Sequence, residues 1–301
     1  MKDKRIAVLM GGLSAEREVS LKSGQAVHAA LLRLGYNSIA IDVGQDLAQQ
    51  LTDHRIEVAF IALHGRYGED GCVQGLLELM QIPYTGSGVL ASGLAMHKLC
   101  SKLAFSAAGL TITPYIAVKS GEQVSPEQLP FGLPVVVKPL REGSSIGISR
   151  VFREEEWEPA TREALRHGRE MLVESYVPGR ECTVGLLGNA ALPVVEIVPE
   201  DGYYDYQAKY VRDTTRYIVP AALPEDCAAR AQALAQAFFT ALGCRGFARA
   251  DFILGDGGDM VFLEMNSIPG FTPSSLLPKA AHAAGIDFPE LCRRIMEMAE
   301  V

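Results

Sequence analysis

The chain has 301 residues, of which 48% are hydrophobic and 21% are charged, and its formal net charge is −8. A soluble chain of this length buries a large core and commonly divides into two or three packed units. The acidic balance argues against a nucleic-acid partner, because such proteins usually present a basic face. It leaves room for a nucleotide substrate, since a few lysines and arginines can hold phosphates on an acidic protein.

The cysteines and the apolar runs indicate a cytoplasmic protein. None of the six cysteines forms a Cys-x-x-Cys pair, so the sequence gives no zinc or redox motif, and we interpret them as reduced thiols. The apolar stretch near the N-terminus is too short for a secretion signal. No apolar run is long enough to cross a membrane. We therefore expect a cytoplasmic chain with no membrane partner.

Residues 1–89 alternate short apolar runs with helical patterns. The runs predict buried strands at 6–10, 39–43, 58–63 and 82–84. Apolar residues at helical spacing predict helices over 19–34 and 73–80. This order is typical of an open parallel βαβ sheet, which binds ligands at the carboxyl ends of its strands.

Residues 90–176 predict a small α+β unit. It begins with one long helix over 90–108. A hairpin follows, in which a glycine- and serine-rich turn at 141–147 joins strands at 135–138 and 148–152. A glutamate-rich helix over 154–167 and a strand at 171–174 complete the unit.

Residues 177–301 predict a second α+β unit. Its strands are expected at 182–187, 192–198, 246–254 and 260–265. Asp226 is placed to cap an alanine-rich helix that ends at Leu242, and two helices close the chain. The tyrosine-rich loop at 200–216 is long for a compact domain, and such loops are often functional. It predicts a lid over a reactive intermediate, or else a loop that its aromatic side chains fold over the core.

The standard nucleotide and hydrolase motifs are absent. There is no Gly-x-x-x-x-Gly-Lys-Ser/Thr loop, and the Gly11-Gly12 pair after the first strand is not a dinucleotide fingerprint. There is also no His-Glu-x-x-His zinc motif and no Gly-x-Ser-x-Gly elbow. Any phosphate chemistry must therefore use a different kind of phosphate-binding site.

Two residue pairs on neighbouring predicted strands carry the strongest chemical signal. Arg249 and Asp251 share one face of their strand, as do Glu264 and Asn266, because side chains alternate along a strand. Two carboxylates and an amide oxygen suit Mg²⁺ bound to phosphates, and an arginine beside them can neutralise developing negative charge. The alternative is an exposed polar strand face with surface ion pairs.

A second cluster combines a lysine with a flexible loop. Lys138 ends its strand, and the loop at 141–147 offers backbone N–H groups and hydroxyls to phosphate oxygens. A glycine-serine turn in a hairpin is often only a turn. Lys98 on the preceding helix is a weaker candidate, because on its own a solvated helix lysine is the better explanation.

Glu16 and His64 follow the first and third predicted strands. Both therefore lie where open parallel sheets bind ligands. Glu16 has the alternative role of a first-turn carboxylate at a helix N-terminus. His64 has the alternative role of a structural histidine.

Five motifs, in order along nearly the whole chain, resemble the D-alanine–D-alanine ligase family. They are Gly11-Gly12-x-Ser14-Ala15-Glu16-Arg17-Glu18-Val19-Ser20; His64-Gly65-Arg66; Lys138-Pro139-x-Arg141-Glu142-Gly143-Ser144-Ser145; Tyr204-Asp205-Tyr206-x-Ala208-Lys209-Tyr210; and Glu264-x-Asn266-x-x-Pro269-Gly270. The resemblance implies an ATP-grasp fold with an N-terminal βαβ domain (1–89), a central domain (90–176) and a C-terminal domain (177–301) that carries the lid (200–216).

The resemblance also implies where ATP and metal ions bind. ATP would lie between the central and C-terminal domains. Two Mg²⁺ ions, or Mn²⁺ in their place, would be held by Asp251, Glu264 and Asn266. The ATP-binding residues would be Lys98, Lys138, Ser145 and Lys209 at the phosphates, and Glu174 and Glu181 at the adenine and ribose.

The implied reaction joins two D-alanines through a D-alanyl phosphate, for peptidoglycan synthesis. Glu16 would anchor the ammonium of the first D-alanine beside His64, and Glu16, Ser144 and Tyr210 would form a hydrogen-bonded set. Arg249 and the N–H of Gly270 would stabilise the oxyanion. Ser275 and Leu276 would receive the carboxylate of the second D-alanine. The resemblance further implies a homodimer through the N-terminal domain.

Some positions depart from the family pattern. His97 stands before Lys98 where an acidic residue is expected, and Met265, Ile268 and the pair at 273–274 also differ. An ATP-grasp ligase with a different amino-acid or hydroxy-acid second substrate is the main alternative. A nucleotide-binding module without catalysis would be expected to lack Asp251, Glu264 or Asn266, and a redox enzyme would need a dinucleotide fingerprint.

Overall fold

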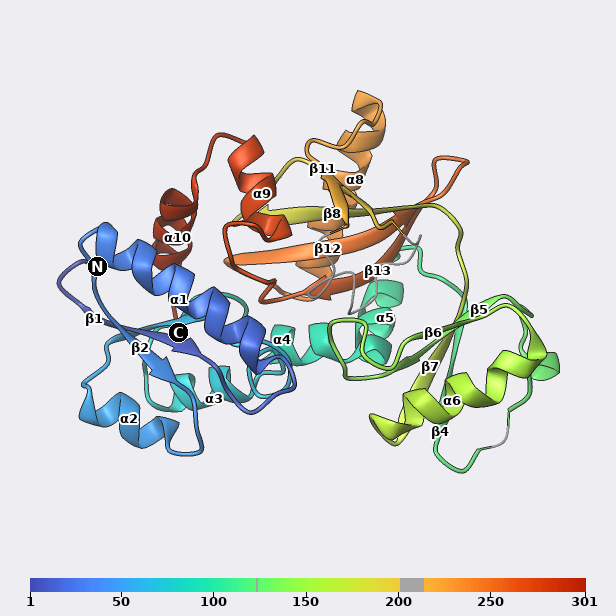
Figure 1. Ribbon diagram of the computed structural model, residues 1–301, viewed down its shortest axis with the longest axis horizontal. Helices are drawn as coiled ribbons and strands as arrows, with labels where there is room; N and C mark the ends of the chain where they lie inside the picture. The colour runs from blue at the N-terminus through green and yellow to red at the C-terminus, as the bar shows by residue number, and fades with distance from the viewer. Residues whose placement is uncertain (123, 201–213) are drawn as a thin grey trace.

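The computed structural model describes residues 1–122, 124–200 and 214–301. Three separate sheets organise this part of the chain, and they lie in one elongated molecule (Figure 1). Among the described residues, no helix is both long enough and apolar enough to span a bilayer.

The N-terminal sheet is parallel, as predicted. Strand β1 (Arg5–Met10) pairs with β2 (Asn37–Asp42) on one side and with β3 (Val58–Ile61) on the other. Helix α1 (Arg17–Arg33) packs on one face, and α2 (Leu47–Asp53) and α3 (Cys72–Leu79) lie on the other face (Figure 1). Helix α2 was not predicted. The strand expected at 82–84 is reduced to isolated bridges at Tyr84.

The prediction of one long helix over 90–108 is wrong, because the helix is interrupted at His97. Helix α4 (Val89–Met96) ends there, and α5 (Lys98–Ala107) begins. His97 has an extended backbone, and its Nδ1 accepts a hydrogen bond of 3.3 Å from the N–H of Cys100, which caps α5. The N–H of Lys98 is bound by the carbonyl of Leu140 at 3.0 Å, so the break directs Lys98 toward the glycine- and serine-rich loop.

The second sheet has four antiparallel strands. Their order is β4 (Tyr115–Lys119), β7 (Glu170–Ser175), β5 (Val135–Pro139) and β6 (Ser149–Val151). Strand β4 was not predicted. The helix expected over 154–167 begins with a 3₁₀ turn, Glu154–Glu156, and becomes α-helical only in α6 (Trp157–Arg166). Helix α6 covers one face of the sheet with Trp157, Ala160 and Ala164 buried against it.

The third and largest sheet is also antiparallel. Its path runs β11 (Arg216–Ile218), β10 (Val195–Val198), β8 (Arg180–Leu187), β12 (Phe247–Leu254) and β13 (Met260–Asn266), with β9 (Ala190–Ala191) beside β8. Helix α8 (Glu225–Ala241) packs on β8 and β12. Asp226 lies in the first turn of α8, and Pro224 takes the cap position that was expected for Asp226. Helices α9 (Leu276–Ala283) and α10 (Phe288–Glu297) follow.

Aromatic side chains join the N-terminal sheet to the large sheet. Phe60 on β3, Phe247 on β12 and Phe271 are fully buried, and their ring centroids lie 5.7–6.5 Å apart. Buried residues of α9 and α10 belong to the same core as β1 and β3. The N-terminal sheet and the C-terminal helices are therefore packed together. The domain boundaries expected after 89 and 176 stay predictions.

A second aromatic group holds α5 and α8 on the large sheet. The Phe262 ring stacks on Phe238 with a centroid separation of 3.9 Å and meets the Phe105 ring edge at 4.8 Å. These three rings connect helices α5 and α8 with strand β13, so α5 is held by the large sheet although it precedes the small one.

We expect Phe262→Ala to destabilise the protein by about 3–5 kcal/mol, because it removes a buried aromatic ring and leaves a cavity. The free energy of unfolding from urea titration checks this. Leu79→Ala is the control, because Leu79 is 86% exposed and its loss should change that free energy by less than about 0.5 kcal/mol. Equal effects of the two substitutions would contradict the packing described here.

Candidate active site

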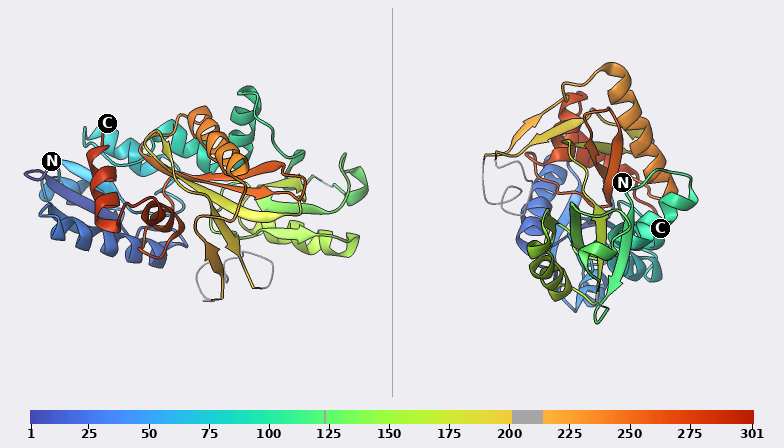
Figure 2. Two further views of the ribbon diagram at one scale, coloured as in Figure 1. Left: turned by 90° about the horizontal axis from the view of Figure 1, so that it is seen from above. Right: turned by 90° about the vertical axis from the view of Figure 1, so that its right-hand side faces the viewer.

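A cavity of about 340 Å³ is lined by residues of both the four-stranded sheet and the large sheet. Figure 2 gives two further views of these sheets. Part of its wall is apolar, made by Val136, Ile148, Val177, Ile253 and Leu263. Another part carries charged side chains, among them Lys138, Glu174, Glu181, Asp251 and Glu264. An apolar slot that continues into a charged region suits a ligand with a flat ring at one end and phosphates at the other.

The pairing of β12 with β13 brings the two predicted residue pairs together. Asp251 lies opposite Glu264, and Arg249 lies opposite Asn266, with a bulge immediately after Asp251. The Arg249 guanidinium binds both carboxylate oxygens of Asp251 at 2.8 Å. Asn266 Nδ2 donates to Asp251 at 2.9 Å, and the hydroxyl of Thr183 on β8 donates to it at 2.5 Å. Asp251 and Thr183 are buried and the other members are partly buried, so the cluster is not an exposed polar face.

The oxygen atoms at this position fit a hard divalent cation. Asp251 and Glu264 both line the cavity, and Asn266 supplies an amide on the same face. Within the described ranges, no group of three or more His, Cys, Asp or Glu side chains is placed to hold a metal ion. Two carboxylates and an amide are an incomplete set, so phosphate oxygens of a ligand would have to complete the coordination of Mg²⁺.

A buried ionic cluster lies on the other side of the cavity. Lys138 Nζ on β5 is 3.1 Å from Glu174 Oε2 on β7, and Lys102 Nζ on α5 is 3.5 Å from Glu174 Oε1. Thr113 joins Lys102 to Glu174 by hydrogen bonds of 2.7 and 3.1 Å. Burial alone would raise the pKa of the Glu174 carboxyl, but the two lysines outweigh burial and hold it below its usual value.

Sequence reasoning missed Lys102 and Thr113 in this cluster. Lys102 comes one helical turn after Lys98, so the two lysines lie on the same side of α5. That spacing was available in the sequence. Thr113 precedes β4, a strand that was not predicted, and so no signal placed it at the site.

The glycine- and serine-rich loop connects the cavity to the N-terminal sheet. Lys98 Nζ donates to the carbonyl of Glu142 at 2.6 Å and lies 3.8 Å from Glu264 Oε2. Ser144 and Ser145 both have positive φ, at 50° and 61°. This strained turn directs the Ser144 hydroxyl to the Glu16 carboxylate, with which it forms a hydrogen bond, while Ser145 lines the cavity.

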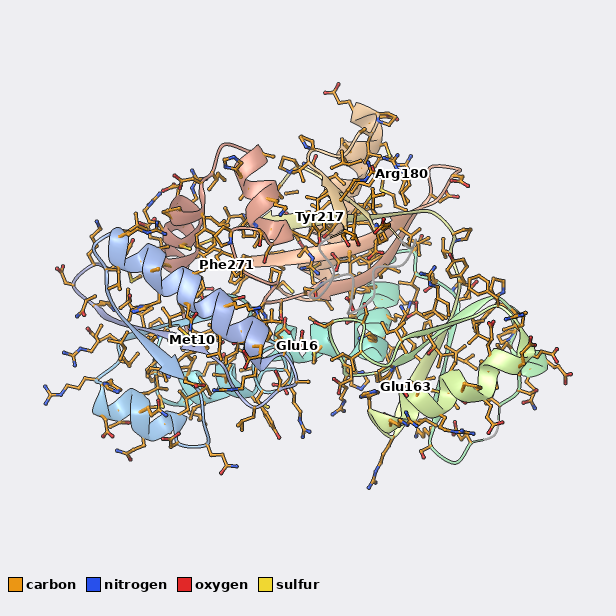
Figure 3. All side chains as sticks on the ribbon, viewed as in Figure 1. Met10, Glu16, Glu163, Arg180, Tyr217 and Phe271 are labelled. Carbon is orange, nitrogen blue, oxygen red and sulfur yellow. The ribbon has the colours of Figure 1, made fainter. Side chains whose placement is uncertain are left out.

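Glu16 is buried at the N-terminus of α1, near the middle of the molecule (Figure 3). A Cβ on Gly65 would lie only 2.5 Å from Glu16 Oε2, so only glycine permits this approach. A second carboxylate, Glu69, accepts a hydrogen bond of 2.6 Å from the N–H of Gly65. Burial, and then the negative charge of Glu16, raise the pKa of Glu69 to about 8. Sequence reasoning missed Glu69, although it follows His64 by only five residues.

His64 is engaged by the protein at both ring nitrogens. Its Nδ1 lies 3.1 Å from the carbonyl of Ile268, and its Nε2 lies 3.0 Å from the Ser23 hydroxyl. Because a carbonyl only accepts, Nδ1 carries the proton and Nε2 accepts from Ser23. Burial lowers the pKa of His64 to about 4, so the ring is neutral at pH 7. This geometry suits a structural histidine, and its predicted contact with substrate stays a prediction.

The segment before α9 forms the remaining side of the site. The N–H of Phe271 donates to Ser23 at 3.2 Å, which fixes Gly270 beside α1. Ser275 accepts from the N–H of Thr272 at 3.1 Å and is the residue before α9, while Leu276 begins that helix and is buried. Of the predicted residues, Lys209 and Tyr210 lie outside the described residues, as does most of the predicted lid.

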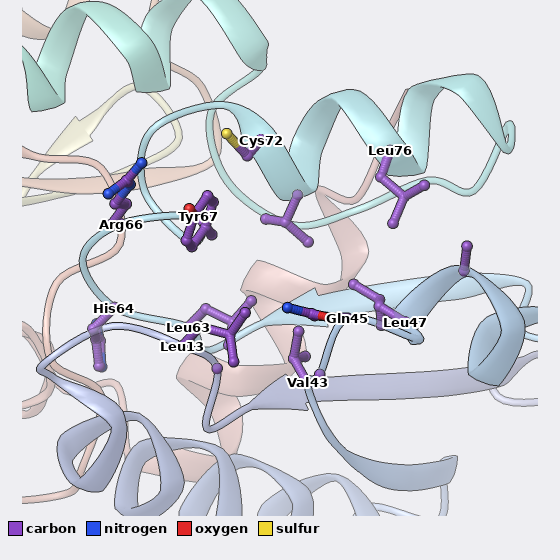
Figure 4. A pocket seen from close by; sticks show the side chains of 15 residues that line it. Leu13, Val43, Gln45, Leu47, Leu63, His64, Arg66, Tyr67, Cys72 and Leu76 are labelled. Carbon is purple, nitrogen blue, oxygen red and sulfur yellow. The ribbon is translucent and has the colours of Figure 1, made fainter.

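A second cavity, of about 290 Å³, lies at the carboxyl ends of the parallel strands (Figure 4). Leu13, Val43, Leu63 and Leu76 project into it, with Arg66 and Tyr67 at one side. Among the residues that the structure describes, those lining this cavity include no carboxylate and are mainly apolar. It therefore lacks the groups that a metal-bound phosphate needs.

The fold and the first cavity define the class of this protein. Two antiparallel sheets, each with helices on one side, close on a slot that has Lys138 and Glu174 on one wall and the carboxylates of Asp251 and Glu264 on the other. This is the architecture of an ATP-grasp ligase.

Comparison with protein families identifies the member of that class. Residues 104–297 match the family model described as the D-ala D-ala ligase C-terminus, and residues 44–87 match the model of its N-terminus. The chain belongs to the D-alanine–D-alanine ligase family, as its motifs indicated.

Curated relatives and solved structures agree with this assignment. The chain is 55% identical over 296 residues to the D-alanine–D-alanine ligase of Trichlorobacter lovleyi, covering 98% of this chain and 95% of the relative. It is 52% identical over 299 residues to that of Geotalea uraniireducens, covering 99% and 96%. A D-alanine–D-alanine ligase of Bacillus anthracis, solved with ATP, superimposes with a TM-score of 0.86 at 33% identity, covering 98% of this chain and 97% of that chain. The ATP-grasp fold prediction is confirmed.

The raised pKa of Glu69 makes a prediction about stability. The unfolded chain loses the Glu69 proton near pH 4.5, whereas the folded chain keeps it until about pH 8, so stability falls as pH rises through this window. In Glu69→Gln the side chain cannot titrate, so this loss of stability with rising pH is removed. We expect the melting temperature of the variant, relative to the wild type, to rise by roughly 2–4 °C between pH 5 and pH 8. Glu127→Gln, at an exposed carboxylate, should show no such change, and a flat difference for Glu69→Gln would contradict the burial of this carboxyl.

Proposed function

We propose that this chain joins two D-alanines into D-alanyl-D-alanine, with conversion of ATP to ADP and phosphate, and so supplies peptidoglycan precursor synthesis. The observation that carries the proposal is the Arg249–Asp251–Asn266 cluster, whose Asp251 lines a nucleotide-sized cavity together with Glu264. Two relatives that are more than 50% identical to this chain over almost its whole length are named for this activity.

ATP would occupy the cavity between the two antiparallel sheets. The apolar walls around Val136 and Ile253 suit the base, with Glu174 and Glu181 at the adenine and ribose. Lys98, Lys138 and Ser145 lie on the charged side, where they would bind the phosphates. Lys209 is proposed for the same role by resemblance.

Asp251, Glu264 and Asn266 would hold two Mg²⁺ ions, or Mn²⁺ in their place. These ions would neutralise negative charge on the phosphate oxygens. Neighbouring residues orient the carboxylate oxygens that would bind these ions. Arg249 and Thr183 fix the Asp251 carboxylate, and Lys98 lies close to Glu264.

The first step would transfer the γ-phosphoryl group of ATP. A carboxylate oxygen of the first D-alanine attacks phosphorus, and ADP leaves, which gives D-alanyl phosphate. Glu16, oriented by Ser144, would bind the substrate ammonium, with His64 fixing the backbone behind it. The protein contributes mainly position and charge in this step.

In the second step, the amine of the second D-alanine attacks the carbonyl carbon. The tetrahedral intermediate carries an oxyanion, which Arg249 and the N–H of Gly270 would stabilise. The intermediate then collapses and releases phosphate. Ser275 and Leu276, at the N-terminus of α9, would receive the substrate carboxylate, because helix N-termini attract anions.

The remaining expectations belong to the same proposal. Tyr210 would join Glu16 and Ser144, and the segment 200–216 would close over the acyl phosphate and exclude water. We also propose a homodimer, a cytoplasmic location and the three-domain division at 89 and 176. The substrates support the location, since ATP and nascent wall precursors are both cytoplasmic.

The decisive assay mixes the protein with ATP, Mg²⁺ and D-alanine, and follows phosphate release together with dipeptide by mass spectrometry. We expect equal amounts of phosphate and D-alanyl-D-alanine, and no product from L-alanine. A D-lactate arm tests a hydroxy-acid second substrate. Phosphate without dipeptide would move the proposal to another second substrate, and no phosphate under any condition would refute it.

Arg249 provides a test of the oxyanion role. We expect Arg249→Ala to lower kcat by about 10²–10³-fold, with a much smaller change in KM for ATP, because Arg249 does not line the nucleotide cavity. Arg249→Lys should recover only part of kcat, since lysine cannot bind both Asp251 oxygens in the same way. Arg230→Ala, at an exposed arginine on α8, is the control and should leave kcat unchanged. An equal loss of kcat in both alanine variants would contradict the assignment.

A further inference from the structure

Lys102 lies behind the nucleotide cavity and does not line it. It is on α5 and is 4% exposed, with its Nζ 2.7 Å from the Thr113 hydroxyl and 3.5 Å from Glu174 Oε1. Thr113 and Glu174 do line the cavity. Lys102 can therefore influence a bound nucleotide only through these two neighbours.

The Glu174 carboxylate is held at both oxygens. Oε2 is 3.1 Å from Lys138 Nζ and accepts from the Thr113 hydroxyl at 3.1 Å, while Oε1 faces Lys102. The two cations hold the pKa of this carboxyl below its usual value in spite of its burial. An ionised carboxylate has no proton to donate, so Glu174 presents only acceptors to the cavity.

An acceptor at the edge of a flat apolar slot distinguishes purine bases. The walls beside Glu174 include Val136, Ile148 and Leu263, which suit the faces of a base. Adenine carries a donating amino group at C6, whereas guanine and hypoxanthine carry an accepting oxygen at that position. A carboxylate that faces this edge binds adenine and repels the other two bases.

We propose that Lys102 is a positioning residue that sets the preference for ATP, by keeping the Glu174 carboxylate ionised and aimed at the base. The inference rests on the ATP-dependent function proposed above and extends it to base selection. Without the Lys102 charge, Glu174 Oε1 would lose its cation, and a carboxyl that gains a proton can donate to an oxygen at C6. The preference for ATP over ITP would then weaken.

The surroundings of Lys102 also give the preference a dependence on pH. Lys102 faces Glu174 on β7, Lys138 on β5 and the ring of Tyr115 on β4, whose centroid lies 5.3 Å from Nζ. Burial lowers the pKa of Lys102 to about 8. The lysine charge is present below this pH and is lost above it. Glu174 stays ionised at high pH, but its Oε1 then loses the cation that holds it in place, so the preference should decline between pH 7 and pH 9. An arginine at this position would keep its charge throughout.

The test compares kcat/KM for ATP and ITP, at saturating D-alanine, in the wild type, Lys102→Met, Lys102→Arg and Lys119→Met. Lys119 is an exposed lysine on β4 and is the matched control for loss of one charge. We expect Lys102→Met to lower the ratio of kcat/KM for ATP to that for ITP about tenfold at pH 7, mainly by raising KM for ATP. A tenfold change corresponds to the loss of about one hydrogen bond to a charged group. Lys102→Arg and Lys119→Met should keep the wild-type ratio.

An unchanged ratio in Lys102→Met, or an equal loss with both nucleotides, would overturn the inference. If Lys102→Met does not fold, the test is the ATP/ITP ratio of kcat/KM, measured between pH 7 and pH 9 in the wild type and in Lys102→Arg. The ratio should fall further in the wild type than in Lys102→Arg, and this comparison cancels titration of the nucleotides themselves. Equal pH profiles would overturn the inference. Failure of the wild type to form dipeptide from ATP would instead refute the proposed function.

Discussion

A charge that is removed from water must be paired, and the interior of this protein is arranged around that constraint. Glu174 lies between Lys102 and Lys138, Asp251 is bound by Arg249 and Asn266, and Lys98 contacts the Glu142 carbonyl near Glu264. An unpaired charge at any of these depths would be strongly destabilising. Arg249 and Asp251 lie on one strand, but the other partners join different elements, so these interactions help to position the two walls of the cavity as well as its binding groups.

The N-terminal sheet contributes to the site because it is packed firmly against the large sheet. The rings of Phe60, Phe247 and Phe271 form one buried group across this junction. Hydrogen bonds from Phe271 to Ser23, from Ser23 to His64, and from His64 to the Ile268 carbonyl run beside it. The four-stranded sheet reaches the N-terminal sheet through Ser144 and Glu16. Glu16 therefore sits between the N-terminal sheet on one side and the glycine- and serine-rich loop of the four-stranded sheet on the other.

Local sequence patterns predicted most of the strands and the pairing that builds the Asp251 cluster. Alternation along two short strands indicated that Arg249, Asp251, Glu264 and Asn266 share a face, and the register agrees. The long helix over 90–108 was wrong, because an unbroken apolar pattern gave no sign that His97 would cap a new helix. Strand β4 was missed because it is short and only partly buried, and its pairing with β7 comes from a distant part of the chain.

The sequence by itself determined the family, the fold class and the chemical groups available, because motifs, periodicity and residue types are local properties. Only the tertiary structure decided how those groups are used. It buried Lys102 behind Glu174, surrounded His64 with protein partners at both nitrogens, and placed Glu69 against Glu16. Burial and charge pairing depend on which segments meet in space, and residues such as His64 and Ile268 are separated by most of the chain. That is why the protonation and partners of these groups could not be predicted from their neighbours in sequence.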